Sequence, residues 1–132
     1  ADSGSWANIC ALPAYWVGLL YNEEALHEAA ALVSDIGAKD VMDGRLSVAK
    51  DGLRGKLGQY DVYDLAAKTL DLAASGLRRR GIFDDGGNDE TGFLQPLRAV
   101  ISSKKTPAEV MLDHYHGDWK ENIDQVFTSN QY

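Results

Sequence analysis

The sequence predicts an all-α domain of about five to seven helices, arranged around one apolar helix near the N-terminus. Apolar residues recur at spacings of three and four along most of the chain, and residues typical of helix starts and ends stand between these runs. No segment shows a credible strand pattern, and no internal repeat is visible. Residues 1–132 are expected to form a single domain that buries roughly two thirds of its unfolded surface.

The central apolar stretch runs from Trp6 to Tyr21, and it carries no charged side chain from Ile9 onward. It is too short to cross a bilayer, which needs roughly 20 apolar residues. Pro13 suits the first turn of a helix, so we expect a helix from about Pro13 to Leu20. That helix would be apolar on every side, and it is therefore predicted to be covered all round as the buried centre of the domain.

The next segment predicts a second helix, capped by Asn22 and continuing to Ile36. Gly37 is expected to end this helix in a left-handed conformation. Residues 38–50 show a weaker helical spacing that a glycine interrupts, and residues 51–60 are interpreted as a glycine-rich loop.

The clearest helix is predicted to start after Asp61 as its cap and to run to Arg80, with Gly81 closing it. Three arginines at its end face the negative pole of the helix. The predicted buried stripe consists of Val62, Leu65, Ala66, Leu70, Ala73 and Leu77.

The C-terminal part is predicted to begin with a turn-rich connector at 84–89. Asn88 or Asp89 is expected to cap the helix that follows, which is predicted over 91–102 with Pro96 near a start or a kink. Thr106 to Glu109 combines a capping box with a proline at the first helical position, which predicts a helix that stops at Gly117. A last short turn is expected around Ile123, Val126 and Phe127.

Composition excludes several classes of partner. Hydrophobic residues make up 45% and charged residues 25% of the chain, as in an ordinary globular protein. The formal charge of −7 argues against nucleic acid or an anionic membrane surface, because both attract a concentrated basic surface. The single cysteine excludes an internal disulfide. The chain starts at Ala1 without an initiator Met or a signal-like segment, which fits either a processed mature protein or a trimmed sequence and is compatible with earlier removal of a targeting peptide.

No residue pattern predicts a metal or catalytic site within the chain. His114 and His116 are two residues apart, so on a helix they point in different directions, and they are expected to cap carbonyls near Gly117. The acidic segment 84–90 lacks the spacing of a calcium loop, and the glycines and cations of 52–56 lack that of a phosphate loop.

The cysteine and the tryptophans are assigned to the core. Cys10 has no charged neighbour in the sequence to tune it, so a buried, inert thiol is the expectation. Trp6, Trp16 and Trp119 are expected to be core residues.

A family resemblance begins in the apolar stretch. The stretch matches the string Trp-x-x-Leu-Cys-Ala-Leu-Pro-Ala-aromatic-Trp-Val-Gly-Leu-Leu-Tyr at Trp6, at Cys10 through Ala14 and at Trp16 through Tyr21. Tyr15 stands at the aromatic position. This string resembles the signature that opens the C-terminal region of glutamate–cysteine ligases of the plant and proteobacterial type. Further matches follow in the same order at Gly76-Leu77, Arg79-Arg80, Asp89-Glu90-Thr91, Phe93-Leu94, Thr106-Pro107-Ala108-Glu109, His116-Gly117, Trp119, Val126-Phe127 and Tyr132.

The resemblance implies the helical C-terminal part of an ATP-dependent enzyme that begins glutathione synthesis. In that family the catalytic machinery lies on an antiparallel sheet whose metal-binding glutamates are mostly upstream of the matched region. ATP and Mg²⁺ are therefore expected only if the chain is part of an intact ligase. Ala7 and Asn8 stand where family members commonly carry two arginines, and Ser5 stands where a proline is usual. Loss of two cations beside a pocket for anionic substrates weakens the binding of glutamate or phosphate.

Three functional hypotheses follow. The first is a non-catalytic structural or interaction subunit that docks on protein partners in a larger assembly. The expected compartment is an organelle, either a plastid or a mitochondrion, and the cytoplasm is the alternative. The second is a piece of a split or trimmed ligase that is active only with the missing catalytic part. The third is a free-standing module that binds an amino acid or thiol near Trp6 and Cys10. Under the first, the predicted interaction surface is bordered by Trp6, Tyr15, Trp119, Val126 and Phe127.

Overall fold

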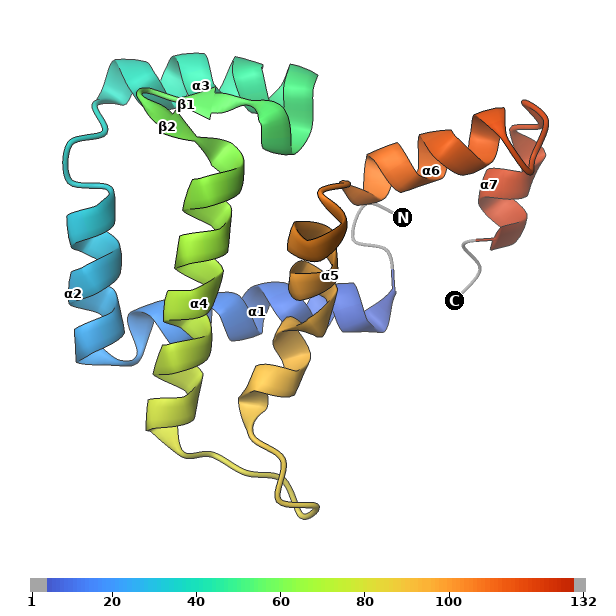
Figure 1. Ribbon diagram of the computed structural model, residues 1–132. Helices are drawn as coiled ribbons and strands as arrows, with labels where there is room; N and C mark the ends of the chain where they lie inside the picture. Colours follow the sequence, from blue (N-terminus) through green and yellow to red (C-terminus); the bar gives the residue numbers. More distant parts are fainter. Residues whose placement is uncertain (1–4, 130–132) are drawn as a thin grey trace.

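The computed structural model describes residues 5–129 and confirms the all-α prediction, with seven α-helices in that range (Figure 1). The helices are α1 (Trp6–Leu20), α2 (Glu23–Leu32), α3 (Ala38–Asp51), α4 (Val62–Arg80), α5 (Gln95–Ser103), α6 (Pro107–His116) and α7 (Asp124–Ser129). Two 3-10 turns, η1 (Gly52–Arg54) and η2 (Glu90–Leu94), and the short strands β1 (Lys56–Leu57) and β2 (Tyr60–Asp61) complete the elements. No helix in this range is long and apolar enough to cross a membrane.

Helix α1 begins earlier than predicted. The Ser5 hydroxyl accepts a hydrogen bond from the backbone N–H of Asn8, and the helix continues straight through Pro13. A proline inside a helix removes one backbone hydrogen bond and costs about 3 kcal/mol. The contacts of α1 with α4, α5 and η2 offset that cost, so Pro13 lies in the middle of the helix and does not start it.

Helices α1 and α4 cross at unusually close range. Gly18 of α1 and Gly76 of α4 are both buried there, as are Ala73 and Ala25 beside them. A Cβ on Gly18 would lie 2.2 Å from the carbonyl oxygen of Ala73, so no larger residue fits in the present backbone arrangement. The crossing fixes both the separation and the rotation of α1 relative to α4.

The core lies between α1, α4 and η2. Its buried cluster is small and consists of Leu19, Leu70, Ala73, Ala74, Leu77 and Leu94. The predicted α4 is confirmed in both bounds, and Gly81 ends it with a left-handed φ of 64°. Asp61 occupies the cap position without a side-chain capping bond; its carboxylate instead lies 2.7 Å from the Lys56 ammonium.

The segment from α2 to α4 corrects three predictions. Helix α2 ends at Leu32, and Gly37 starts α3 with a φ of −81°, so it does not close α2. Its N–H donates to the Asp40 carboxylate at 3.0 Å, which gives α3 the cap that sequence reasoning missed. Residues 51–60 were interpreted as a loop, but β1 and β2 pair there as an antiparallel hairpin. Gly58, with a φ of 58°, supplies the positive dihedral that the two-residue turn needs.

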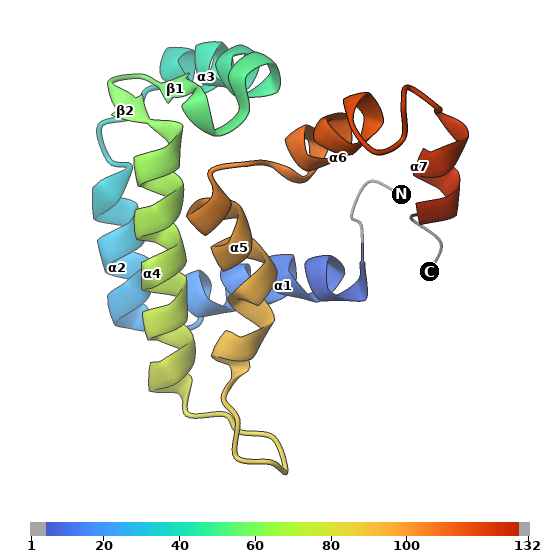
Figure 2. The same cartoon turned by 45° about the vertical axis from the view of Figure 1, so that its right-hand side comes forward.

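The C-terminal helices follow the prediction more closely. Asp89 caps η2 by accepting from the Thr91 N–H, and the α-helix proper begins at Gln95, with Pro96 in its first turn. The capping box of Thr106 and Glu109 starts α6 as predicted. Residues 107–129 form what we call the C-terminal arm, which lies to one side of α2, α3 and α4 in both Figures 1 and 2. Helix α6 contains no buried residue.

Candidate functional site

One side of α1 is apolar and exposed. The prediction that this helix is covered all round is wrong, because only Ala11, Gly18 and Leu19 are buried in it. Leu12, Trp16 and Leu20 are 56%, 50% and 50% exposed. We define the outer face of α1 as the residues Trp6, Ile9, Leu12, Pro13, Trp16 and Leu20, which are all exposed.

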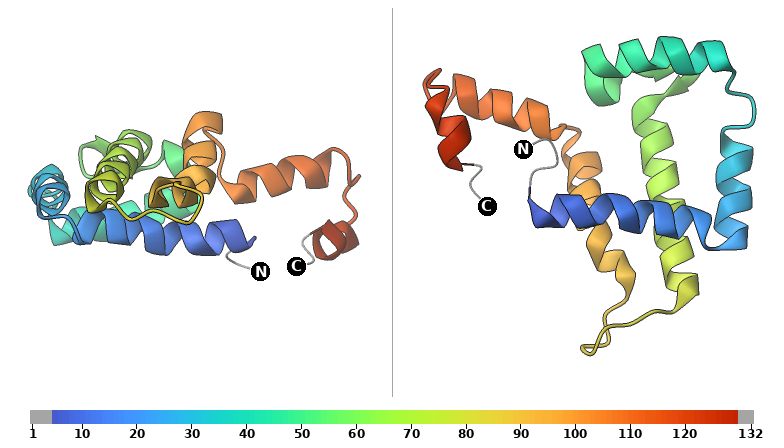
Figure 3. Two further views of the ribbon diagram at one scale, coloured as in Figure 1. Left: turned by 90° about the horizontal axis from the view of Figure 1, so that it is seen from below. Right: turned by 180° about the vertical axis from the view of Figure 1, so that it is seen from behind.

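The outer face is a continuous stripe. Ile9, Leu12, Trp16 and Leu20 follow one another at spacings of three, four and four, so they share one side of the helix. Figure 3 shows α1 lying across α4 and α5, which cover it from one side only. The stripe carries no charged side chain, whereas the chain as a whole has a formal charge of −7.

The predicted interaction residues lie in two places. Trp6 in α1 and Phe127 in α7 are each 72% exposed. Tyr15 is half-buried and packs against the core, with its ring edge-on to Trp16 at a centroid distance of 5.4 Å. Trp119 and Val126, both half-buried, belong to the C-terminal arm. Figures 1 and 2 place the arm on the side of the molecule where α1 begins.

Sequence reasoning missed Leu12, Trp16 and Leu20 as surface residues. Their helical spacing was visible in the sequence, but an apolar stripe has the same pattern whether protein or solvent covers it. Trp6 and Trp16 are exposed, which corrects their assignment to the core. Cys10 is exposed as well, which corrects the expectation of a buried thiol.

The histidines take part in local contacts of the arm. His114 stacks on Trp119 with ring centroids 5.6 Å apart, and its Nδ1 lies 3.4 Å from the Asp118 carboxylate. His116 Nδ1 lies 3.7 Å from the Glu121 carboxylate. Within residues 5–129, no three histidine, cysteine or acidic side chains come together in a way that could hold a metal ion.

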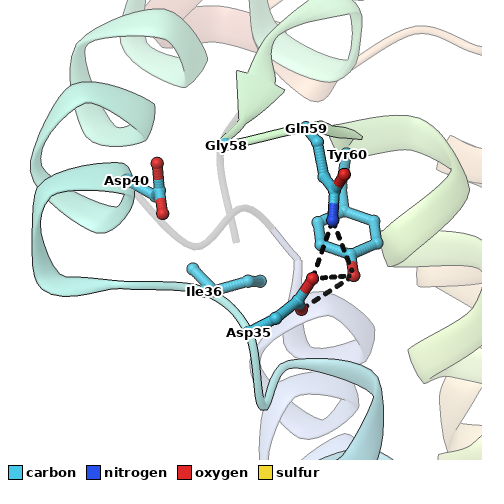
Figure 4. Close-up of a pocket in the computed structure, with 6 residues that line it drawn as sticks. All are labelled: Asp35, Ile36, Asp40, Gly58, Gln59 and Tyr60. Carbon is cyan, nitrogen blue, oxygen red and sulfur yellow. Dashed lines mark hydrogen bonds between the residues drawn. The ribbon is translucent and has the colours of Figure 1, made fainter.

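A cavity of about 300 Å³ lies between the α2–α3 connection and the turn of the hairpin (Figure 4). The Tyr60 hydroxyl lies 2.7 and 2.8 Å from the two Asp35 carboxylate oxygens, and Gln59 Nε2 donates to the same carboxylate at 2.7 Å. The hydrogen bond from Tyr60 lowers the pKa of Asp35, and the same bond raises the pKa of Tyr60. Since these groups satisfy one another, the cluster joins the hairpin to the α2–α3 connection and is not a ligand site.

The C-terminal arm is tied to the body through Glu109. Its carboxylate accepts from the Thr106 N–H at 2.8 Å, from the Thr106 hydroxyl at 2.9 Å and from Arg54 Nη1 at 2.6 Å. The backbone bond from Thr106, followed by the bond from Arg54, lowers the pKa of Glu109 to about 2. One carboxylate thus starts α6 and holds the arm to η1.

Comparison with known proteins shows the family of this chain. A model of the glutamate-cysteine ligase family 2 (GCS2) matches residues 1–129. The chain belongs to this ligase family. It is 42% identical over 127 residues to glutamate–cysteine ligase A, chloroplastic, of Oryza sativa subsp. indica, a match that covers 96% of this chain and 25% of the rice protein.

Other plant members of the ligase family match in the same way. The chloroplastic glutamate–cysteine ligases of Solanum lycopersicum and Arabidopsis thaliana are 38% and 37% identical to it, and each match covers 96% of this chain and 23% of the relative. The chain therefore spans about a quarter of the length of these curated relatives. The outer face of α1 lies within the segment that carries the family resemblance, Trp6 to Tyr21.

Proposed function

We propose that the chain is a non-catalytic interaction module that binds a protein partner through the outer face of α1, as part of a larger assembly. The observation that carries this proposal is the charge-free apolar stripe of Leu12, Trp16 and Leu20, half or more exposed in a helix that the fold covers on one side only. A contiguous apolar patch of this kind marks a protein interaction site in a soluble domain. Trp6 belongs to this surface, and we propose that Tyr15, Trp119, Val126 and Phe127 border it on α1 and on the C-terminal arm.

The lack of charge on the outer face favours a permanent interface over a transient one. Interfaces of obligate complexes resemble a domain core cut in half, and their centres are depleted of charged residues and enriched in aromatic ones. Trp6 and Trp16 supply the large aromatic groups that dominate binding energy at such centres.

Two considerations support a module that does no chemistry by itself. The family resemblance places the catalytic sheet and its glutamates upstream of the matched region. Ala7 and Asn8 also stand where arginines are common in the family, and neither side chain can neutralise an anionic substrate. Within residues 5–129 no three histidine, cysteine or acidic side chains come together in a way that could hold a metal ion, and we derive no catalytic step through Mg²⁺–ATP in this chain.

A plastid is the compartment we propose. The rice, tomato and Arabidopsis relatives are all described as chloroplastic enzymes. A plastid assembly is therefore the first place to look for the partner.

A second candidate function is a piece of an ATP-dependent glutamate–cysteine ligase that is active only with the missing catalytic part. Sequence identity of 42% with the rice ligase over 96% of this chain favours it, because the relationship extends through both the core and the surface residues. Under this candidate, ATP and Mg²⁺ would be held by the catalytic part.

The test is gentle isolation of the native chain, measurement of the size of the complex that carries it, and identification of its components by mass spectrometry. For the interaction module we expect a stable complex that lacks a ligase catalytic part. A thiol reagent should label Cys10 slowly in that complex. A companion with the ligase catalytic part, together with glutamate–cysteine ligase activity, would select the second candidate. A monomer with a freely reactive Cys10 would contradict both.

A further inference from the structure

We propose that the C-terminal arm is a hinged strap that closes over the first turns of the outer face of α1, and that the ion pair between Arg54 and Glu109 is the latch that holds it in the open position of this structure. This inference rests on the proposed role of the outer face as a docking surface. It adds a regulation of that surface, because a closed arm would occupy the place of the partner.

The hinge lies between two adjacent lysines in the connection from α5 to α6. The Lys104 ammonium lies over the ring of Tyr63 in α4, 4.8 Å from its centroid, so Lys104 belongs to the body of the fold. The Lys105 ammonium pairs with the Asp113 carboxylate in α6, so Lys105 belongs with the arm. The Ser103 hydroxyl bridges the two units by accepting from the Lys105 N–H at 3.3 Å and donating to its carbonyl at 3.4 Å. Hydrogen bonds of that length are weak.

The backbone at the hinge is in an uncommon conformation. Lys104 has a φ of 55°, in the left-handed region that residues with a side chain seldom adopt. A change of the dihedral angles at this residue would reorient the arm as a whole, while the body on one side and α6 on the other keep their own contacts.

The latch lies at η1, where the arm meets the body beyond the hinge. Arg54 Nη1 lies 2.6 Å from Glu109 Oε1, and this is the one ion pair within residues 5–129 that joins the arm to an element preceding α5. The Arg54 side chain is 70% exposed, so water and salt screen the pair. Helix α6 contains no buried residue, so core packing does not reinforce the latch along that helix.

The two surfaces that closure would bring together are both apolar. The arm exposes Leu112, Ile123 and Phe127, and the first turns of α1 expose Trp6 and Ile9. The left view of Figure 3 shows the arm beyond the N-terminal end of α1, with α7 at the level of that helix. Burial of these groups against one another is favourable in water, so release of the latch favours the closed arm.

Cys10 allows closure to be measured in the full isolated chain, because it is exposed and is the only cysteine. A nitroxide attached to Cys10 enhances the relaxation of nearby amide protons, which NMR reads along the arm. Arg54→Ala removes the latch from the side of η1. Glu109→Gln removes the charge from the side of α6 and keeps a residue that can still complete a capping box.

We expect the relaxation enhancement at the amides of α7 to rise about twofold or more in either variant, because the population of the closed arm grows. Added salt should produce the same rise in the wild-type chain and little change in Arg54→Ala, where the latch is already absent.

Three controls make the result specific. Lys39→Ala breaks the exposed ion pair of Lys39 with Asp43 inside α3 and should leave the enhancement at α7 unchanged. Backbone chemical shifts report whether α6 stays helical, and if Glu109→Gln unfolds it, Arg54→Ala decides, since that variant leaves the capping box intact. A mixture of nitroxide-labelled chains with isotope-labelled chains that carry no nitroxide detects contact between two copies.

Several outcomes would overturn the inference. Equal enhancement in the wild-type chain and in Arg54→Ala would show that Arg54 does not restrain the arm. A lower enhancement in the variant would show that the arm swings away from α1, and enhancement in the mixed sample would assign the contact to a second copy.

The proposed function is tested separately in the native complex. Loss of the partner from Leu12→Glu, together with an arm that does not close, would sink this inference alone. Retention of the partner by Leu12→Glu would count against the proposed docking surface, whatever the arm does.

Discussion

Gly76 of α4 faces the carbonyl oxygen of Gly18 in α1 so closely that a Cβ on Gly76 would lie 1.9 Å from that oxygen. The two helices therefore meet backbone to backbone. This contact leaves Leu12, Trp16 and Leu20 on the opposite side of the helix, where they form part of the exposed outer face. The close packing of Gly18 against Gly76 in the core thus determines which side chains of α1 form the surface to which we assign the function.

Gly76→Ala is expected to destabilise the protein by about 2 kcal/mol or more, because the added methyl group meets backbone and forces the helices apart. The free energy of unfolding is measured by urea denaturation. Gly92→Ala is the matched control, since nothing lies within 4 Å of a Cβ built there. A Gly76→Ala variant as stable as the Gly92→Ala variant would show that the crossing is looser than described.

Leu94→Ala is expected to cost about 2–5 kcal/mol of folding free energy, because Leu94 is fully buried in a small core with few other large side chains. Leu46→Ala, at the exposed position on α3, is expected to change stability by less than about 0.5 kcal/mol. Thermal and urea unfolding of the two variants side by side provides the measurement. Similar losses in both would mean that the core is elsewhere.

The Glu109 carboxylate gives the arm a predictable response to acid. Its pKa is lowered from 4.5 to about 2, so its stabilising contribution is complete above about pH 4.5 and is lost as the pH falls toward 2. We expect the Thr106 amide resonance in NMR spectra to shift over that range, together with resonances of α6. In Glu109→Gln the titration should disappear, and persistence of the same shift would assign it to another group.

The hydrogen-bonded pair of Asp35 and Tyr60 is expected to lose its contribution to stability both at low pH and at high pH. The pKa of Asp35 is below its ordinary 3.8, so its contribution to stability is present above that value and is lost as the pH falls through the folded pKa. The pKa of Tyr60 is above its ordinary 10.0, so the contribution of the hydroxyl is present up to that value and is lost as the pH rises further.

Ultraviolet titration of tyrosinate measures the Tyr60 side of this pair. The wild-type chain should show a late-ionising component from Tyr60, and Tyr60→Phe should remove that component. Asp35→Asn should lower the pKa of Tyr60 toward its ordinary value. A late component that survives in Tyr60→Phe belongs to a different tyrosine.

Local signals in the sequence were sufficient for α4 and α6. The long apolar stripe and Gly81 define α4 without reference to the rest of the chain, whereas Asp61 stands at the predicted start without making the predicted capping bond. Thr106 and Glu109 define the start of α6 in the same way. In both helices the determinants lie within a few residues of the end they specify.

Elements that depend on distant contacts were not predictable. Pro13 lies inside α1 because α4, α5 and η2 hold the helix from one side, and no local pattern encodes that support. The hairpin forms where three glycines suggested a loop, because Gly58 completes a turn whose strand lies against α3. Exposure of Cys10 and Trp16 depends on which side of α1 the crossing at Gly18 selects.

The uncovered side of α1 also bears on how a cell would regulate the amount of this protein. Quality-control chaperones and proteases continuously remove polypeptides that display apolar surface. A chain made in excess of its partner would show Leu12, Trp16 and Leu20 to that machinery, whereas an assembled chain would not. Its abundance would then follow the supply of the partner, and the stoichiometry of the complex would be set by degradation of the unassembled copies.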